Sequence, residues 1–330
     1  MSLRSRVWLF SRSGGSSTPT PLLASSNYDT HLSTGGHSIT LTGTDLDGAT
    51  VVYDPGGANE TTATVTGNTS TTVTFTTPNI TPGTYDVVVT TSGGTSNPLT
   101  IEALSIAAST PSLWCSASYP GSPWPSSDAS SLNLHHATPA TVGTTPLNGF
   151  DPADFNGTNQ QLVSYNTAAS ATVNASAIIS TGGGTLYAFA NIRTANAFAS
   201  VQGQKALITR QASNGLGLTY SSSGLRAYVY DGSTKEPGSA IAFSTGVPQG
   251  FHMRWDGTNM YQGVAAGTET SVATTGPSTL TSPMVVGRGH TNTLAFYSDS
   301  LVYEVLMFSS CLSLATLGKF EKAFRCKYAL

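Results

Sequence analysis

Charged side chains are scarce in this 330-residue chain: Asp, Glu, Lys and Arg make up 9% of it, against about 25% in an ordinary soluble domain. Solubility must therefore come from Ser, Thr, Asn and Gly, a composition that suits extracellular or particle-bound β-proteins. Hydrophobic residues still make up 38% of the chain, which is enough to build a core and argues against disorder.

Basic residues are missing from a long stretch. Arg4, Arg6 and Arg12 lie near the start, the next basic residue is Arg193, and every charged residue in between is acidic. Because the basic residues form no dense patch, we predict that the chain does not bind nucleic acid.

Cysteine is rare as well, with only Cys115, Cys311 and Cys326. Their odd number and wide spacing predict neither a metal site nor a disulfide framework. We interpret them as small buried side chains, although Cys311 and Cys326 flank the last predicted helix and could in principle approach each other.

Long hydrophobic runs are also missing. None approaches the roughly 20 residues of a membrane-spanning helix, so we predict no membrane partner. Residues 7–10 are too short for the apolar part of a secretory signal, and Arg12 follows closely.

Residues 1–16 combine arginines with apolar side chains and then run into Gly-Gly-Ser-Ser. We predict a flexible N-terminal arm. It is either a disordered leader or a particle anchor that becomes ordered on a partner, with aromatic side chains buried and basic ones on acidic groups. The anchor residues would be Arg4, Arg6, Trp8, Phe10 and Arg12.

Residues 17–103 contain short alternating strands separated by Gly and Pro turn signals about every ten residues. This pattern predicts an antiparallel, immunoglobulin-like sandwich. The predicted strands are 37–43, 49–53, 63–65, 72–76, 85–90 and 99–101.

Two stretches of this segment, GGHSITLTGTDLDGATVVY and TPNITPGTYDVVVTTSGGTSNPLTI, resemble the opening and the ending of an IPT/TIG domain. The resemblance implies a spacer or docking module without catalytic residues. Asp45 and Asp47 lie in a turn and could bind calcium, but no third ligand is nearby in the sequence, so we interpret them as solvated turn acids and predict no cofactor.

Residues 104–330 contain at least ten predicted strands, more than an immunoglobulin domain needs. We predict an all-β fold in which the first sandwich is followed by a larger antiparallel jelly-roll sandwich with one C-terminal helix. Its strands are expected within 113–115, 150–162, 185–192, 206–210, 217–220, 225–230, 251–255, 261–264, 284–287 and 301–308.

The last thirty residues organise this segment. Residues 301–308 are predicted to form a central buried strand, with Glu304 as the only charge. Ser313 is the expected N-cap of the helix, which should cover the open end or flank of a sandwich. Its apolar positions are Leu314, Leu317, Phe324 and Tyr328.

Four landmarks, LWCSAS, NLHHAT, NGFDPADFNGTNQQL and the final EVLMFSSCLSLATLGKFEKAFRCKYAL, resemble a branch of the concanavalin A-like, laminin G-type lectin and glucanase superfamily. Some members hydrolyse glycosides with two carboxylates about 5 Å apart, carried as E-x-D-x-x-E on one strand. This motif is absent, as is a nucleophile elbow, so we predict no enzyme. The nearest acid pairs are Asp45/Asp47, Asp151/Asp154 and Asp299/Glu304.

Sugar binding would use surface aromatic rings together with Asn and Asp acceptors. The alternative interpretation of these residues is ordinary core aromatics and hairpin turns. The candidates are Trp255, Asp256, Asn259 and Tyr261 on one turn, and Tyr228, Tyr230 and Asp231 at another strand end.

Together these features predict a non-enzymatic virion surface protein: a capsid decoration, a head fibre or a tail-associated adhesin of a tailed phage. Phage structural proteins often join such modules, which is an association at the level of folds. The arm or first domain would contact other virion proteins, the second domain would bind host or environmental glycans, and particle symmetry would suit a homo-oligomer. The alternatives are a purely structural particle protein and a bacterial surface or secreted adhesin.

Overall fold

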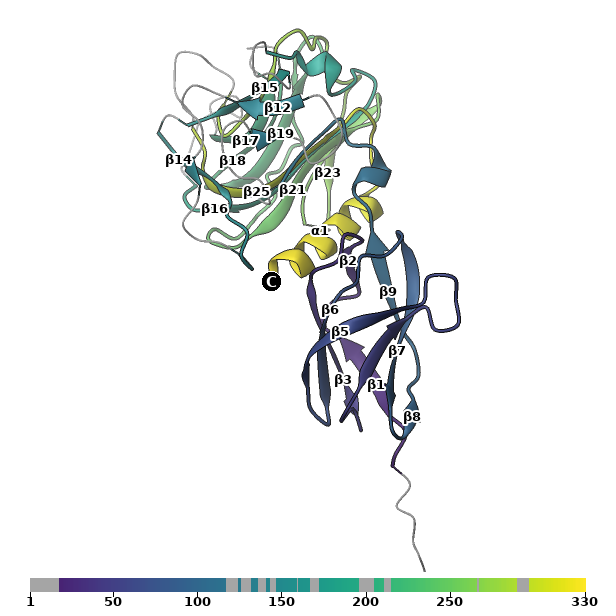
Figure 1. The fold of residues 1–330 in the computed structure, drawn as a ribbon. Helices are drawn as coiled ribbons and strands as arrows, with labels where there is room; N and C mark the ends of the chain where they lie inside the picture. The colour runs from purple at the N-terminus through teal and green to yellow at the C-terminus, as the bar shows by residue number, and fades with distance from the viewer. Residues whose placement is uncertain are drawn as a thin grey trace, which may run out of the picture.

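The computed structural model places the strands in two β-sandwiches that follow one another, with the α-helix of the described residues between them (Figure 1). None of the helices described is long and apolar enough to span a membrane. The structure describes residues 18–116, 124–125, 132–135, 141–142, 147–158, 160–166, 172–195, 205–210, 215–265, 267–289 and 297–330.

The first sandwich is one continuous network of strands in the order β1-β3-β6-β5-β4-β7-β9-β2, with β8 paired to β7. Its pairs are antiparallel except for β2 with β9, which is parallel. The strands are β1 (Leu22–Ser26), β2 (Thr30–Leu32), β3 (Ser38–Thr44), β4 (Thr50–Tyr53), β5 (Thr61–Asn68), β6 (Thr72–Thr76), β7 (Gly83–Thr91), β8 (Gly94–Thr95) and β9 (Leu99–Leu104).

Alternation of side chains builds the core of this sandwich. In β3, Ile39 and Leu41 are fully buried while Ser38 is exposed, because successive residues of a strand face opposite sides. Phe75 of β6 and Tyr53 of β4 meet edge to face in the interior, with ring centroids 6.0 Å apart.

The second sandwich consists of two sheets. One has the order β13-β14-β25-β16-β21-β22-β23, with β10 also paired to β25. Its strands are β10 (Leu113–Ser116), β13 (Thr141–Val142), β14 (Ala153–Asn156), β16 (Gly184–Ile192), β21 (Gln249–Trp255), β22 (Asn259–Val264), β23 (Thr270–Ala273) and β25 (Asp299–Phe308).

The other sheet has the order β11-β12-β15-β24-β17-β18-β19-β20, and its antiparallel pairs complete the sandwich. The prediction of an all-β chain with an immunoglobulin-like sandwich, a larger antiparallel sandwich and one C-terminal helix is confirmed. The strands are β11 (Trp124–Pro125), β12 (Leu132–His135), β15 (Leu162–Asn166), β17 (Lys205–Arg210), β18 (Leu216–Ser221), β19 (Gly224–Tyr230), β20 (Thr234–Lys235) and β24 (Met284–Val286).

The helix α1 (Leu314–Tyr328) begins after Ser313, whose hydroxyl accepts a hydrogen bond from the Thr316 amide at 3.1 Å. This confirms the predicted N-cap. The helix ends at Ala329, which adopts a left-handed conformation. β25, as predicted, is central, because it pairs with β16 on one side and with β14 and β10 on the other.

One side of α1 packs on the outer face of the sheet that contains β25 and β16. Phe324 lies 5.7 Å from Phe189 and 6.0 Å from Tyr187, measured between ring centroids. Tyr328 stacks on Phe189 at 5.6 Å. These rings belong to one buried cluster, and burying such aromatic side chains dominates the energetics of a core.

The other side of α1 reaches the first sandwich. Cys326 is buried in the core of that sandwich, and Leu32 of β2 belongs to the same cluster as the helix aromatics. The helix therefore covers the flank of one sandwich and the end of the other, and it joins them through apolar contacts.

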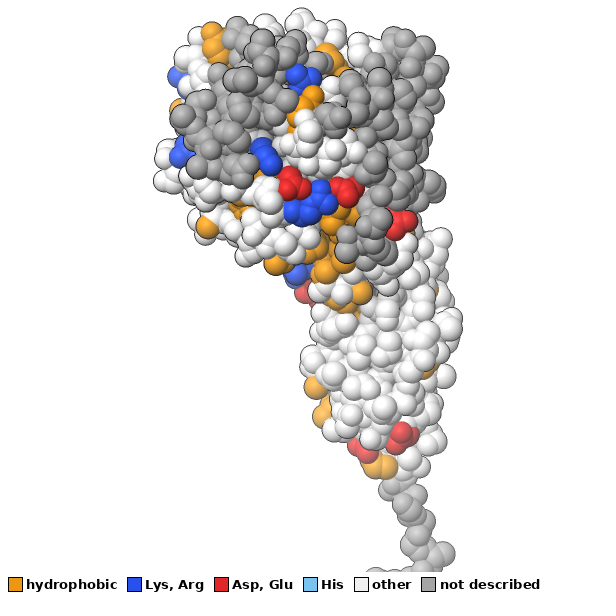
Figure 2. Space-filling model, turned by 90° about the vertical axis from the view of Figure 1, so that its left-hand side faces the viewer, with side chains coloured by type: hydrophobic (Ala, Val, Ile, Leu, Met, Phe, Trp, Pro, Cys, Tyr) orange, Lys and Arg blue, Asp and Glu red, His pale blue; other side chains and the backbone are white. Residues whose placement is uncertain are grey.

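Salt bridges at the rim of this joint add little. Lys319 contacts Glu102 at 2.6 Å and Lys322 contacts Asp29 at 2.6 Å, and exposed pairs of this kind contribute about 0–1 kcal/mol. Figure 2 agrees with an apolar joint: hydrophobic side chains gather at the waist between the sandwiches, whereas the visible face of the first sandwich carries few charged or hydrophobic side chains.

Candidate functional site

Two of the predicted sugar-stacking rings are fully buried. Trp255 lies in the core of the second sandwich, and its indole NH donates to the Ser180 carbonyl at 3.0 Å. Tyr228 also has no exposed surface, and its ring lies over Gly217, where an added Cβ would come within 2.6 Å of it. Neither ring has a face open to solvent, which removes both from the predicted sugar-binding set.

Asp256, Asn259 and Tyr261 lie at the turn between β21 and β22. One carboxylate oxygen of Asp256 accepts from the amides of Thr258 and Asn259 at 2.9 and 2.8 Å, and the other accepts from the Tyr261 hydroxyl at 3.1 Å. The hydrogen bond from the Asn259 amide lowers the pKa of Asp256, and those from the Thr258 amide and the Tyr261 hydroxyl act in the same direction. These contacts stabilise the turn.

The structure brings the second predicted group close to this turn. Tyr230 and Asp231 are half-buried, and Asp231 accepts a hydrogen bond from the Thr274 hydroxyl at 2.9 Å. The amide of Thr274 donates to the Thr258 carbonyl at 2.9 Å. Sugar binding by this combined surface remains a prediction.

The predicted anchor residues Arg4, Arg6, Trp8, Phe10 and Arg12 lie outside the described residues. Asp45 and Asp47 are exposed. Within the described ranges, no three His, Cys, Asp or Glu side chains gather where they could hold a metal ion. No disulfide joins Cys115, Cys311 and Cys326 to one another, and Cys115 and Cys326 are buried.

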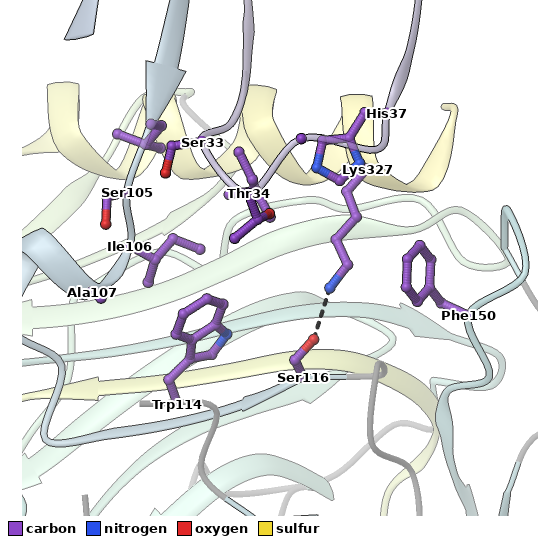
Figure 3. A pocket seen from close by; sticks show the side chains of 13 residues that line it. Ser33, Thr34, His37, Ser105, Ile106, Ala107, Trp114, Ser116, Phe150 and Lys327 are labelled. Carbon is purple, nitrogen blue, oxygen red and sulfur yellow. Dashed lines mark hydrogen bonds between the residues drawn. The ribbon is translucent and has the colours of Figure 1, made fainter. Parts of the chain in front are cut away.

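A pocket of about 440 Å³ opens at the joint between the two sandwiches (Figure 3). Its volume lies within the range of roughly 300–1,000 Å³ that is usual for small-molecule sites. We call it the joint pocket. It is lined by Leu32, Ser33, Thr34, Gly35 and His37 of the first sandwich, Leu104 at the end of β9, Ser105, Ile106 and Ala107 of the connection, Trp114, Ser116 and Phe150 of the second sandwich, and Lys327 of α1.

Trp114 and Phe150 give the joint pocket its aromatic walls. Both are half-buried, and Figure 3 shows them on opposite sides of the Lys327 side chain, which descends from α1. The Lys327 ammonium lies 4.8 Å from the centroid of the Phe150 ring, a cation–π distance.

A buried ion pair closes the floor of the joint pocket. Glu304 has no exposed surface and Lys327 is 4% exposed. The Lys327 ammonium donates to Glu304 Oε1 and to Ser116 Oγ, each at 2.7 Å. Glu304 also accepts from the Tyr328 hydroxyl at 2.6 Å and from the Trp114 indole NH at 2.8 Å. A buried ion pair needs such additional hydrogen bonds to offset the cost of removing both charges from water.

His37 is another polar residue that lines this pocket. Its side chain is buried, and its Nε2 atom has no hydrogen-bond partner among the residues that the structure describes. Burial, together with the nearby His31 and Lys327, lowers the pKa of His37 to about 4. The imidazole is therefore neutral near pH 7.

This lowered pKa makes stability depend on pH. Between about pH 6.5 and pH 4 the unfolded chain binds a proton at His37 that the folded chain does not, so acidification favours unfolding. We expect the wild-type protein to lose on the order of 2 kcal/mol from this group between pH 7 and pH 5.

Urea unfolding at the two pH values measures this loss. His37→Gln should reduce the difference in the free energy of unfolding between the two pH values. Part of the difference should persist, because burial also lowers the pKa of His31. An identical pH dependence in the variant would show that His37 is not the group responsible.

Sequence reasoning missed the joint pocket because its residues come from distant segments. One available signal was Glu304, the only charge in a buried strand. A fully buried carboxylate requires a partner, but its ammonium lies 23 positions further along the chain.

Two carboxylates of the second sandwich lie close to each other on Arg193. Arg193 bridges Asp154 and Asp299, with its Nη2 atom 2.6 Å from one and its Nε atom 2.7 Å from the other. Asp154 lies on β14, Asp299 lies on β25, and Arg193 follows directly after β16. Both carboxylates are engaged by the same guanidinium, and the cluster ties three strand ends together.

Comparison with known families identifies the first sandwich. Residues 25–103 match the IPT/TIG domain model, so this segment is an IPT/TIG domain and the predicted resemblance is confirmed. No curated protein sequence matches the chain.

Solved structures with similar folds include carbohydrate-binding domains and the binding domains of toxins. Domain 4 of AbnA, a GH43 extracellular arabinanase from Geobacillus stearothermophilus, in complex with arabinotriose, has a TM-score of 0.43 at 8% identity, over 55% of this chain and 81% of that one.

The CBM40 of the Ruminococcus gnavus IT-sialidase, bound to α2,3 sialyllactose, has a TM-score of 0.36 at 12% identity, over 43% of this chain and 83% of that one. The botulinum neurotoxin serotype G binding domain has a TM-score of 0.44 at 12% identity, over 64% of this chain and 50% of that one. Membership of residues 104–330 in the concanavalin A-like superfamily remains a prediction.

Proposed function

We propose that this chain is a non-enzymatic protein of a virion surface, attached by its N-terminal arm and carrying a glycan-binding second sandwich. The observation that supports this proposal is that the chain enters the first sandwich at the end remote from the second sandwich (Figure 1). Residues 18–20 lie at the end of the first sandwich remote from the second (Figure 1). There, the Thr20 hydroxyl donates to the Gly93 carbonyl at 3.2 Å, beside the turn between β7 and β8.

This direction suits display. An arm fixed to a particle at one end would hold the second sandwich at the other end, a full domain away. Because α1 packs on both sandwiches through buried aromatic and apolar side chains, the first sandwich would serve as a stiff spacer and not as a loose tether.

Glycan binding is supported by the chemistry of the joint pocket. It combines the half-buried Trp114 ring with hydroxyl groups of Ser33, Thr34 and Ser105, and sugar sites pair aromatic surface with a few placed polar groups. We propose no enzyme activity. The two carboxylates of Asp154 and Asp299, which lie close together, are both engaged by the guanidinium of Arg193.

Deleting residues 1–16 tests the attachment. We expect the deletion protein to fold, since those residues precede β1, and to be incorporated into particles roughly tenfold less or worse, because buried aromatic anchors are typically worth 2 kcal/mol or more each. The measurement is the number of copies per purified particle by quantitative mass spectrometry. The control exchanges Gly and Ser within residues 13–17 and should be incorporated normally. Normal incorporation of the deletion protein would refute the arm as the anchor.

A further inference from the structure

We propose that the joint pocket is a binding site for the end of a neutral sugar chain, and that the ligand contacts both sandwiches at once. This inference rests on the proposed glycan-binding function and specifies its site and its ligand class. The position is different from the turn between β21 and β22 that the sequence favoured.

The charges of the pocket favour a neutral ligand. Among the described residues that line the pocket, Lys327 carries the charge. The Glu304 carboxylate lies 2.7 Å from its ammonium group and neutralises it. An acidic sugar would have to displace Glu304 from Lys327 and leave a fully buried carboxylate without its cation, which is strongly unfavourable. A neutral sugar leaves this ion pair intact.

The polar groups of the pocket match hydroxyls. The Nε2 atom of His37 is buried without a hydrogen-bond partner in the described part of the chain, and a neutral imidazole nitrogen either donates or accepts according to its tautomer. A sugar hydroxyl can take either role. Leaving a buried polar atom unsatisfied is costly, so a ligand that supplies the missing partner is favoured.

The apolar wall fits the C–H face of a sugar ring. The Trp114 indole is half-buried at the pocket, and its NH is held by Glu304 at 2.8 Å, so the ring is fixed in orientation before a ligand arrives. Figure 3 shows Thr34 of the first sandwich facing the same space from above. A ring between Trp114 and Thr34 would touch both sandwiches.

Thr34→Trp in the full-length protein tests the site. Thr34 is an exposed residue that lines the pocket, so a large side chain there should fill the space while the fold and the Lys327–Glu304 pair remain. The matched control is Thr62→Trp, because Thr62 is exposed on β5 and does not line the pocket. Circular dichroism would check that both variants are folded.

The probes are printed neutral glycans ending in glucose, galactose, mannose or an N-acetylhexosamine, and acidic glycans ending in sialic or uronic acid. We expect the wild-type protein to bind one or more neutral glycans. The affinity measured by titration calorimetry should fall by about tenfold or more in Thr34→Trp, as for loss of a central contact, and stay unchanged in Thr62→Trp.

The other outcomes separate the two proposals. Neutral glycan binding that is equal in wild type and Thr34→Trp would overturn the joint pocket as the site and leave the glycan-binding function standing. Binding of acidic glycans only would overturn the ligand class. No binding to any glycan would overturn the glycan-binding function and this inference together.

Discussion

Replacing Glu304 by alanine is expected to lower the free energy of unfolding by about 3–5 kcal/mol, the usual cost of removing one partner of a buried ion pair. The side chain has no exposed surface, and its loss would leave the Lys327 ammonium buried without its carboxylate. The Tyr328 hydroxyl and the Trp114 indole NH would also lose their acceptor.

A double variant separates the ion pair from the packing around it. In Glu304→Leu with Lys327→Met both charges are removed and most of the volume is kept, so the double variant should be more stable than Glu304→Ala. Urea unfolding followed by intrinsic fluorescence measures all three proteins. A Glu304→Ala protein within 1 kcal/mol of wild type, on the scale of an exposed pair, would mean that the carboxylate is not paired as described.

Phe324→Ala is expected to destabilise the protein by about 3–5 kcal/mol, as for other large-to-small changes in a core. Phe324 is buried between Tyr187 and Phe189, so its removal leaves a cavity under α1 at the place where the helix joins the two sandwiches. The loss of these contacts weakens the packing of α1 against the sheet that contains β16 and β25.

The matched control for this prediction lies on the same helix. Lys319→Ala removes an exposed partner of Glu102 and should change the free energy of unfolding by less than about 1 kcal/mol. If the two variants unfolded at the same urea concentration, the joint would not depend on the buried aromatic cluster.

The architecture could be predicted from the sequence because strand alternation and turn residues are local signals. The alternating pattern around Ile39 and Leu41 predicted the strand that became β3. The Ser313 cap and the apolar spacing after it predicted α1. The short strands β1 and β2 were missed, since their few residues carry too little pattern.

The second covered side of α1 could not be predicted. An amphipathic pattern assumes one buried face. Three of the predicted apolar residues, Leu317, Phe324 and Tyr328, are buried, but so are Glu321, Cys326 and Lys327. Cys326 packs in the core of the first sandwich, and Lys327 is buried against Glu304 of β25. Glu321 instead accepts hydrogen bonds from the Tyr187 hydroxyl of β16 and the Gly250 amide of β21. None of these partners is visible from the spacing of residues in the helix.

Trp255 and Tyr228, which were predicted to lie at the surface, differ in whether the sequence pattern indicates their burial. Trp255 shares its parity in β21 with Phe251 and Met253, both buried, so alternation places it in the core. Tyr228 has the opposite parity to Leu225, Ala227 and Val229. Alternation alone would put it on the outer face, and its complete burial depends on tertiary packing.

Amide hydrogen exchange of the full-length protein, with and without a neutral glycan from the array, tests most directly whether sugar is bound at the joint. We expect slower exchange at residues 33–37 of the first sandwich and at 105–107 of the connection, which contribute to the lining of the pocket, and no change at 256–261. Slower exchange at 256–261 with the joint unchanged would contradict binding at the joint.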